Sequence, residues 1–283
     1  MKHYETFNQP IYVISDTHGN FEYLLLKLKE YTNINHCVLI ISGDIGFGVM
    51  PLDDYLDICE NINNFCLERH IKLYMIRGNH DDPSYFNEEK INFTNVKTIP
   101  DYSIISVGDE HILCVGGGVS IDRKYRMMRF EKRKELFHNL METDPMFCAI
   151  HELVEPLPSY WHNELPVYDE EKLNEINDMG FNISYVISHT SPKFCFKYNK
   201  DGLATWIEND PTLNDALDIE RDVMTRIYQT LKAQNNLLKI WVYGHFHVHN
   251  DEIIDNTRFV TLANADKVFD VFDLNRKDDA FID

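Results

Sequence analysis

Five apolar runs, each followed at once by polar side chains, constrain this chain more than any other feature. They cover residues 11–15, 38–42, 71–76, 185–188 and 239–243. Continuous apolar runs of this length are typical of strands that are buried on both faces. In an open α/β sheet, ligand sites lie at the carboxyl ends of the strands. We therefore expect the polar residues after these runs to meet at one edge of a sheet.

The residues that follow the runs carry carboxylate, imidazole and amide groups. They are Asp16, His18, Asp44, Asn79, His80, His189, His245 and His247. A core would leave the donors and acceptors of such groups unpaired, so they suit an open site. They are also ligands of divalent metals, and a carboxylate such as Asp44 has the two oxygens needed to bridge a metal pair. A water molecule between two cations is acidified enough to act as hydroxide at neutral pH.

The segments between the runs predict helices and a parallel sheet. Apolar residues recur at spacings of three and four between residues 52 and 69, and a second periodic stretch covers residues 21–31 behind a possible cap at Asn20. Strand, helix, strand, helix, strand is the pattern of parallel strands with right-handed crossovers. Further along, the sequence predicts a hairpin, two helices and three short antiparallel strands. These cover residues 103–107 with 111–115, then 170–179 and 213–231, then 252–254, 259–262 and 268–272.

Composition indicates an ordinary soluble globular protein. The chain has 283 residues, of which 44% are hydrophobic and 26% charged, and we expect one domain over residues 1–283. A net charge of −19 argues against broad electrostatic attachment to nucleic acid or to an anionic membrane. No run approaches the roughly 20 apolar residues that span a bilayer, and the first ten residues are polar, so we expect a cytoplasmic protein. The six cysteines form no C-x-x-C pair and are expected to be buried, reduced thiols.

Positive charge is concentrated in residues 123–134, which contain seven basic residues and one acid. Two interpretations stay open. The run is a solvated helix face, or it borders the metals and steers an anionic substrate, such as a nucleotide or nucleic acid. In the second case, charge reversal at Arg126, Arg129, Lys132 and Arg133 should raise KM for the true substrate and spare a small chromogenic ester. The surrounding residues 123–160 have the least regular pattern of the chain.

The ordered blocks D-x-H, GD, GNHD, H and GHxH resemble the calcineurin-like metallophosphoesterase superfamily, over residues 11–273. The resemblance implies a two-sheet α/β/β/α sandwich with two divalent metal ions at the strand ends, manganese being expected and iron or zinc being alternatives. It implies one metal held by Asp16, His18, Asp44 and His247, and a second held by Asp44, Asn79, His189 and His245. His80 resembles the family's catalytic histidine, which stabilises the transition state and protonates the leaving group. Asn79 can bind metal through its carbonyl and offer its NH₂ group to phosphate.

Two departures narrow the resemblance. The protein Ser/Thr phosphatase branch carries a further Asp and Arg after GD and ends its third block in Glu, whereas this chain has residues 43–48 (GDIGFG) and Asp81. Without that Arg, a bidentate phosphate clamp is missing, which argues against a phosphoprotein phosphatase. Residues 116–123, with Trp161 and Glu164, instead resemble small uncharacterised bacterial and phage members, relative to which residues 124–160 are an insertion.

The sequence therefore predicts a metal-dependent phosphoesterase, a phosphatase or phosphodiesterase. It would hydrolyse a phosphate mono- or diester by in-line attack of a hydroxide that bridges the metals, with His80, Asn79 and Asp44 as catalytic residues. The alternative is a nuclease or nucleotide phosphodiesterase that acts on nucleic-acid ends. A third hypothesis is a non-catalytic scaffold, which usually loses ligands or the catalytic histidine; here all eight positions are present.

Overall fold

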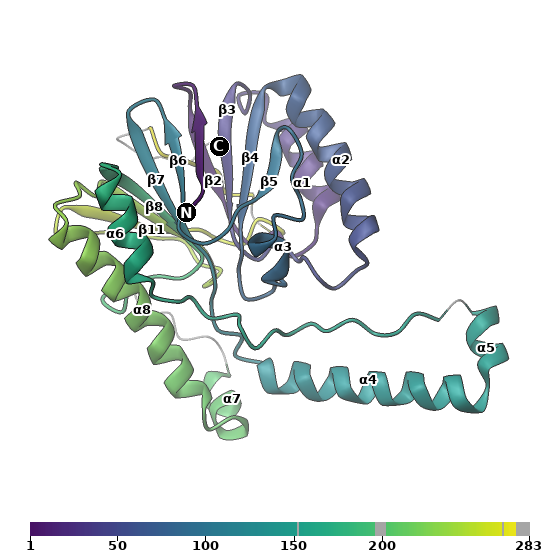
Figure 1. Ribbon diagram of the computed structural model, residues 1–283. Helices are drawn as coiled ribbons and strands as arrows, with labels where there is room; N and C mark the ends of the chain where they lie inside the picture. Colours follow the sequence, from purple (N-terminus) through teal and green to yellow (C-terminus); the bar gives the residue numbers. More distant parts are fainter. Residues whose placement is uncertain (152, 196–201, 268, 276–283) are drawn as a thin grey trace.

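Two β-sheets pack face to face and carry helices on their outer sides, as the computed structural model shows (Figure 1). The structure describes residues 1–151, 153–195, 202–267 and 269–275. The five-stranded sheet has the order β12-β2-β3-β4-β5, and the seven-stranded sheet has the order β1-β6-β7-β8-β9-β11-β10. Helices α1 and α2 lie outside the first sheet, and α6 and α8 lie outside the second (Figure 1). The predicted α/β/β/α sandwich is confirmed.

The bounds of the elements follow. The five-stranded sheet contains β2 (Ile11–Ile14), β3 (Cys37–Ser42), β4 (Ile71–Ile76), β5 (Val96–Thr98) and β12 (Phe272–Asp273). The seven-stranded sheet contains β1 (His3–Thr6), β6 (Ser103–Val107), β7 (Glu110–Val115), β8 (Ile183–Ser188), β9 (Ile240–Tyr243), β10 (Asn250–Ile254) and β11 (Thr257–Thr261). The helices are α1 (Phe21–Glu30), α2 (Leu52–Arg69), α3 (Ser84–Asn87), α4 (Arg123–Thr143), α5 (Pro145–Ile150), α6 (Glu170–Asp178), α7 (Leu203–Asn209) and α8 (Leu213–Ala233).

The layered core explains why the strand sequences are apolar without interruption. In β3, Val38 and Ile40 pack between the two sheets, whereas Leu39 and Ile41 pack toward α1 and α2. Successive side chains of a strand point to opposite faces, so a strand between two apolar layers needs apolar residues at every position. A third apolar cluster, which includes Trp241, fills the space between the seven-stranded sheet and the helices α6 and α8.

Parallel pairing gathers the ends of the strands at one edge. β2, β3 and β4 pair in parallel, with Ile14 opposite Ile41, and β8 pairs in parallel with β9. The predicted cap of α1 is confirmed, because the Asn20 side chain accepts a hydrogen bond from the Tyr23 N–H at 3.3 Å. Loops that carry the predicted ligands thus leave neighbouring strands in the same direction.

The prediction for the chain end is wrong in part. β10 and β11 form an antiparallel pair, but β11 also pairs in parallel with β9. The strand predicted over residues 268–272 is the short β12, and Val268 lies outside the described residues. Phe269 and Val271 are apolar because they pack into the cluster beneath α1 and α2, not because they belong to a strand. The short elements β1, β5, α3 and α7 were not predicted.

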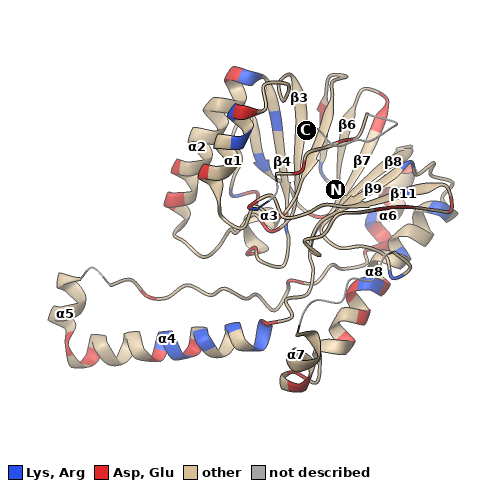
Figure 2. Ribbon diagram, turned by 180° about the vertical axis from the view of Figure 1, so that it is seen from behind, with Lys and Arg blue, Asp and Glu red and all other residues tan. Residues whose placement is uncertain are grey.

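Residues 123–160, which have the least regular sequence pattern, contain the 21-residue helix α4, and the basic run lies on this helix. No residue of α4 is buried, and α4 and α5 project from the body of the molecule (Figures 1 and 2). The single domain with an insertion at residues 124–160 stays a prediction. The six cysteines are free and buried, as expected. Among the described residues, no helix combines the length and the apolarity required to cross a bilayer.

Candidate metal centre

The loops after five strands bring the predicted ligands together at the edge where the two sheets meet. Ligating atoms of Asp16, His18, Asp44 and His247 form one group, and those of Asp44, His189 and His245 form another. Within each group the ligating atoms lie within 4.8 Å of one another. Asp44 is common to both groups, which is the position expected of a bridging carboxylate.

The first group is built around Asp16. Its Oδ1 atom lies 3.2 Å from His247 Nε2 and 3.9 Å from His18 Nε2. The two imidazole nitrogens are themselves 3.2 Å apart, and His18 Nδ1 lies 4.0 Å from Asp44 Oδ2. Two imidazoles and two carboxylates therefore face one small volume.

The second group is built around His189. Its Nδ1 atom lies 2.8 Å from the carbonyl oxygen of Ser42, so this nitrogen donates and Nε2 faces the site. His189 Nε2 lies 3.2 Å from Asp44 Oδ1 and 3.0 Å from Asn79 Oδ1. The ring of His245 lies 4.9 Å from that of His189, measured between centroids. An amide oxygen thus joins the second group, as the resemblance implied.

Five of the seven predicted ligands have backbones in the left-handed region, where φ is positive. They are Asp16 (φ 55°), His18 (46°), Asp44 (51°), His245 (69°) and His247 (56°). Residues other than glycine adopt this region infrequently, and such residues cluster at functional sites. The sharp turns direct side chains back over the strand ends.

The donor set and its electrostatics fit divalent cations. Asp16 Oδ2 accepts hydrogen bonds from the His245 N–H at 3.1 Å and from the Ser15 hydroxyl. Asp16 Oδ1 is buried and has no hydrogen bond of ordinary geometry among the described residues. Burial opposes ionisation of Asp44, but His189 and His80 outweigh it and hold its pKa well below the usual range. Burial lowers the pKa of His189, whereas Asp44 raises it to about 9.

His80 lies beside these groups. Its backbone N–H donates to Asp44 Oδ1 at 2.8 Å, and its Nε2 atom lies 3.9 Å from Asp44 Oδ2. Arg126 Nη2 donates to His80 Nε2 at 3.1 Å. Burial lowers the pKa of His80 to about 4; Asp44 opposes this shift and Arg126 adds to it.

Comparison with known proteins identifies the family. A model of the calcineurin-like phosphoesterase family matches residues 9–249. This chain belongs to the calcineurin-like phosphoesterase family. It is a metal-dependent hydrolase of phosphate esters. No curated protein matches the chain.

Solved structures are similar to this chain at low sequence identity. The TT1561 protein of Thermus thermophilus is 14% identical with a TM-score of 0.52, and the match covers 94% of each chain. A cold-active protein-tyrosine phosphatase of a psychrophilic Shewanella species is 14% identical with a TM-score of 0.39, covering 97% of this chain and 77% of that one.

Two contacts that the sequence did not predict position Asn79. Asn79 Nδ2 donates to Ser120 Oγ at 2.9 Å, and Ser120 Oγ donates to Glu164 Oε2 at 2.7 Å. Burial raises the pKa of Glu164 to about 8. Ser120 accepts one N–H of the Asn79 NH₂ group and the Asn79 carbonyl faces His189; donation of the second N–H to phosphate stays a prediction.

Glu220 is a buried carboxylate behind the second ligand group. It is 1% exposed, it accepts hydrogen bonds from the Val119 N–H at 3.1 Å and from the Thr190 hydroxyl, and its Oε1 atom lies 3.7 Å from His245 Nε2. A sequence signal existed, because Glu220 lies at a spacing of four between Ala216 and Met224 on the apolar face of α8.

Asp81 joins two of the ligand loops. Its carboxylate accepts four backbone N–H groups: those of Ile45 (3.1 Å), Gly46 (2.6 Å), Phe47 (3.0 Å) and Gly78 (2.8 Å). Burial and the nearby Asp44 raise the pKa of Asp81 to about 6, and the N–H donors oppose this. The loop after β3 is thereby fixed to the loop after β4.

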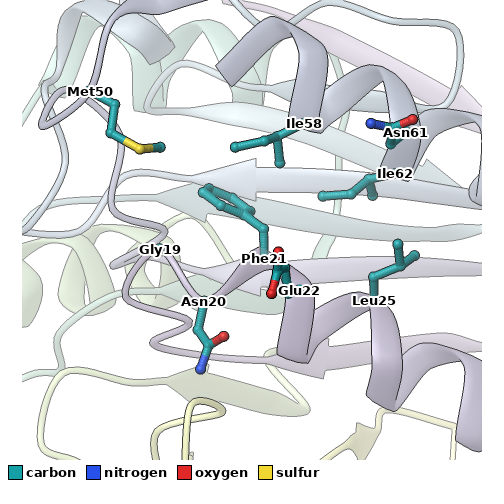
Figure 3. A pocket seen from close by; sticks show the side chains of 9 residues that line it. All are labelled: Gly19, Asn20, Phe21, Glu22, Leu25, Met50, Ile58, Asn61 and Ile62. Atoms are coloured by element: carbon teal, nitrogen blue, oxygen red, sulfur yellow. The ribbon is translucent and has the colours of Figure 1, made fainter. Parts of the chain in front are cut away.

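A pocket of about 300 Å³ opens next to the ligands. Its lining includes His18, His80, Met50, Arg126 and Ser159. A groove of about 420 Å³ between α1 and α2 adjoins it, since both are lined by Gly19 and Met50. Figure 3 shows the side chains of Phe21, Met50 and Ile58 converging in this groove. The pocket next to the ligands thus adjoins an apolar groove beyond Met50.

Proposed function

We propose that this phosphoesterase hydrolyses a small anionic phosphate mono- or diester by in-line attack, with two divalent cations bound side by side. One observation carries the proposal: two ligand groups share Asp44, and His80 lies against the same carboxylate without belonging to either group. In this arrangement the residues of the two groups would bind cations, and His80 would act on the substrate.

The ligand assignment follows the two groups. Asp16, His18, Asp44 and His247 would hold one cation, and Asp44, Asn79, His189 and His245 the other. When bound, such a pair acidifies a water molecule and neutralises charge on the phosphate oxygens. Manganese is our proposal, with iron and zinc as alternatives, since all three accept nitrogen and oxygen ligands.

His80 and Arg126 are proposed to act on the ester. His80 lines the pocket; once the phosphate has accepted the hydrogen bond of Arg126, its negative charge would raise the pKa of His80, and protonated Nε2 would then donate to the departing oxygen. Arg126 Nη2 points at His80 Nε2, so a phosphate oxygen that enters between them can accept from the guanidinium and leave Nε2 facing the ester. Arg126 would thus supply the positive charge that the Arg after GD provides in the protein Ser/Thr phosphatase branch.

The pocket favours a small ester over a nucleic-acid end. Within the described part of the chain, Arg126 is the residue of the basic run 123–134 that lines the pocket, and α4 continues away from the body (Figure 1). The apolar groove beyond Met50 offers space for the organic group of the ester. A nucleotide satisfies both requirements. The cytoplasmic location stays a prediction.

Metal content and turnover, measured on the same variants, test the assignment. Asp44→Asn is expected to abolish turnover and to lower the content of both metals, because Asp44 belongs to both groups. His80→Asn is expected to lower turnover by roughly 10²–10⁴-fold, the usual contribution of a general acid, with metal content unchanged. His249→Asn is the matched control, an exposed histidine two residues after His247, and should change neither quantity.

Turnover is measured with aryl phosphate monoesters and diesters after reconstitution with manganese, iron or zinc, and metal per chain by mass spectrometry. Loss of metal in His80→Asn would contradict the division of roles. Absence of turnover with every metal and ester would instead support a non-catalytic scaffold.

A further inference from the structure

The described residues 123–151 and 153–158 belong to an arm that leaves the body and returns to it (Figure 1). Of the 23 large apolar side chains that are exposed among the described residues, twelve lie between Tyr125 and Leu157. Met146 and Ile150 are 69% and 68% exposed. Concentrations of exposed apolar side chains of this kind mark surfaces that contact another macromolecule.

The base of the arm fixes its direction. Arg123 Nε forms an ion pair with Asp210 at 2.7 Å, and its Nη2 donates to the Thr212 hydroxyl at 2.8 Å. Lys124 Nζ donates to the carbonyl oxygen of Asn209 at 2.6 Å. Since α4 is held away from the body, Leu136, Met146 and Ile150 remain exposed in the single chain.

The charge of the arm is divided along its length. Its proximal part, residues 123–134, carries seven basic residues and one acid. Its distal part, residues 135–150, carries Glu135, Glu142 and Asp144 and no lysine or arginine. Figure 2 shows this division as blue on the half of α4 nearer the body and red toward α5.

We propose that the arm is a dimerisation element that packs antiparallel against the arm of a second copy of this chain. In that arrangement each basic proximal part faces an acidic distal part, and a two-fold axis repeats the match. The apolar side chains on the facing sides of the two arms are covered at the same time.

A second copy fits these observations better than other partners. A nucleic acid would match the basic proximal part alone and leave Met146 and Ile150 in water. Residues 123–158 have a net charge of +1, and the whole chain has a net charge of −19. The body, which is the rest of the chain, therefore has a net charge of −20. Antiparallel arms place the two acidic bodies at opposite ends of paired helices about 30 Å long, well beyond the screening length of about 8–10 Å.

The molar mass in solution tests the proposal, measured by light scattering during size exclusion over a range of protein concentrations. The expected result is a dimer, with twice the monomer mass of 33.4 kDa. Met146→Glu combined with Ile150→Glu should raise the dimer dissociation constant by roughly 100-fold or more, because apolar contacts are lost and charges are placed in the interface. Leu237→Glu is the matched control, since Leu237 is also 69% exposed but lies on the body, and should leave the constant unchanged. Circular dichroism checks that all variants retain their helices.

A charge exchange tests the antiparallel arrangement. Lys132→Glu with Arg133→Glu should weaken the dimer, and adding Glu135→Lys with Glu142→Lys in the same chain should restore it. A monomeric wild type, a dimer that survives Met146→Glu with Ile150→Glu, or failure of the charge exchange to restore the dimer would each overturn the proposal. A monomer that binds a labelled oligonucleotide, and loses it on Lys132→Glu with Arg133→Glu, would overturn it in favour of a nucleic-acid arm.

Discussion

Replacing Arg126 tests most directly whether this phosphoesterase recognises substrate through a residue outside the family motifs. Arg126 Nε is held by Asp122 Oδ1 at 2.7 Å and Nη1 by the carbonyl oxygen of Ser159 at 3.1 Å. Two of its nitrogens are therefore fixed, and Nη2 is directed at His80 Nε2. A hydrogen bond between charged groups contributes roughly 1.5–3 kcal/mol. We expect Arg126→Ala to lower kcat/KM by roughly 10- to 150-fold.

The assay compares kcat/KM for an aryl phosphate monoester at fixed manganese, with metal content measured in parallel. Arg126→Lys should recover part of the loss, because an ammonium keeps the charge but not the forked geometry. Arg129→Ala, an exposed position one turn further along α4, is the control and should change kcat/KM little. Equal losses in Arg126→Ala and Arg129→Ala, or parallel loss of metal in Arg126→Ala, would refute a direct contact with phosphate.

Three further predictions concern the residues around the ligands. Burial raises the pKa of Glu164 to about 8, so the folded state binds the proton of Glu164 more tightly than the unfolded state. The free energy of unfolding should therefore fall by up to about 1.4 kcal/mol per pH unit as the pH rises from about 4.5 to 8. Denaturant unfolding of Glu164→Gln should lack this slope. Ser120→Ala removes the acceptor of Asn79 Nδ2 and should weaken metal binding by roughly 10- to 100-fold in a chelator competition, with an unchanged melting temperature arguing that the fold is intact. A side chain at Gly78 would meet the carboxylate and backbone nitrogen of Asp44, so Gly78→Ala should lose metal and turnover together, and retention of both would contradict the close approach.

The strand pattern could be predicted because burial on both faces leaves a direct trace in the sequence. The side chains of Val38 to Ile41 point alternately into two apolar cores, so all four residues are apolar. The apolar run therefore predicts the strand, but it does not predict which side chains point to which core. The order of the polar residues after the runs then located the site, since parallel strands end at one edge. The arm was not predicted because α4 has no buried face, and a helix without an apolar stripe lacks the periodicity on which prediction depends.

Contacts between distant loops could not be predicted from spacing. Arg126 reaches His80 over 46 positions and Ser120 reaches Asn79 over 41, and nothing in either segment marks the other as its neighbour. Glu220 differs, because an acid on the apolar face of a helix needs a buried partner, and it could have been singled out. Loop geometry was equally hidden, since positive φ at Asp16 or His247 leaves no trace in a single sequence.

The strained turns are held by the protein's own hydrogen bonds. A residue other than glycine with positive φ costs roughly 1–3 kcal/mol, and Asp16, His18 and Asp44 all adopt it. The Asp16 N–H donates to the carbonyl oxygen of Gly43 at 3.1 Å, and the His18 N–H to that of Asp44 at 2.8 Å. Asp81 fixes the loop after β3 in turn, so hydrogen bonds within the protein contribute to the conformations of these ligands. These bonds offset part of the cost of the positive φ angles.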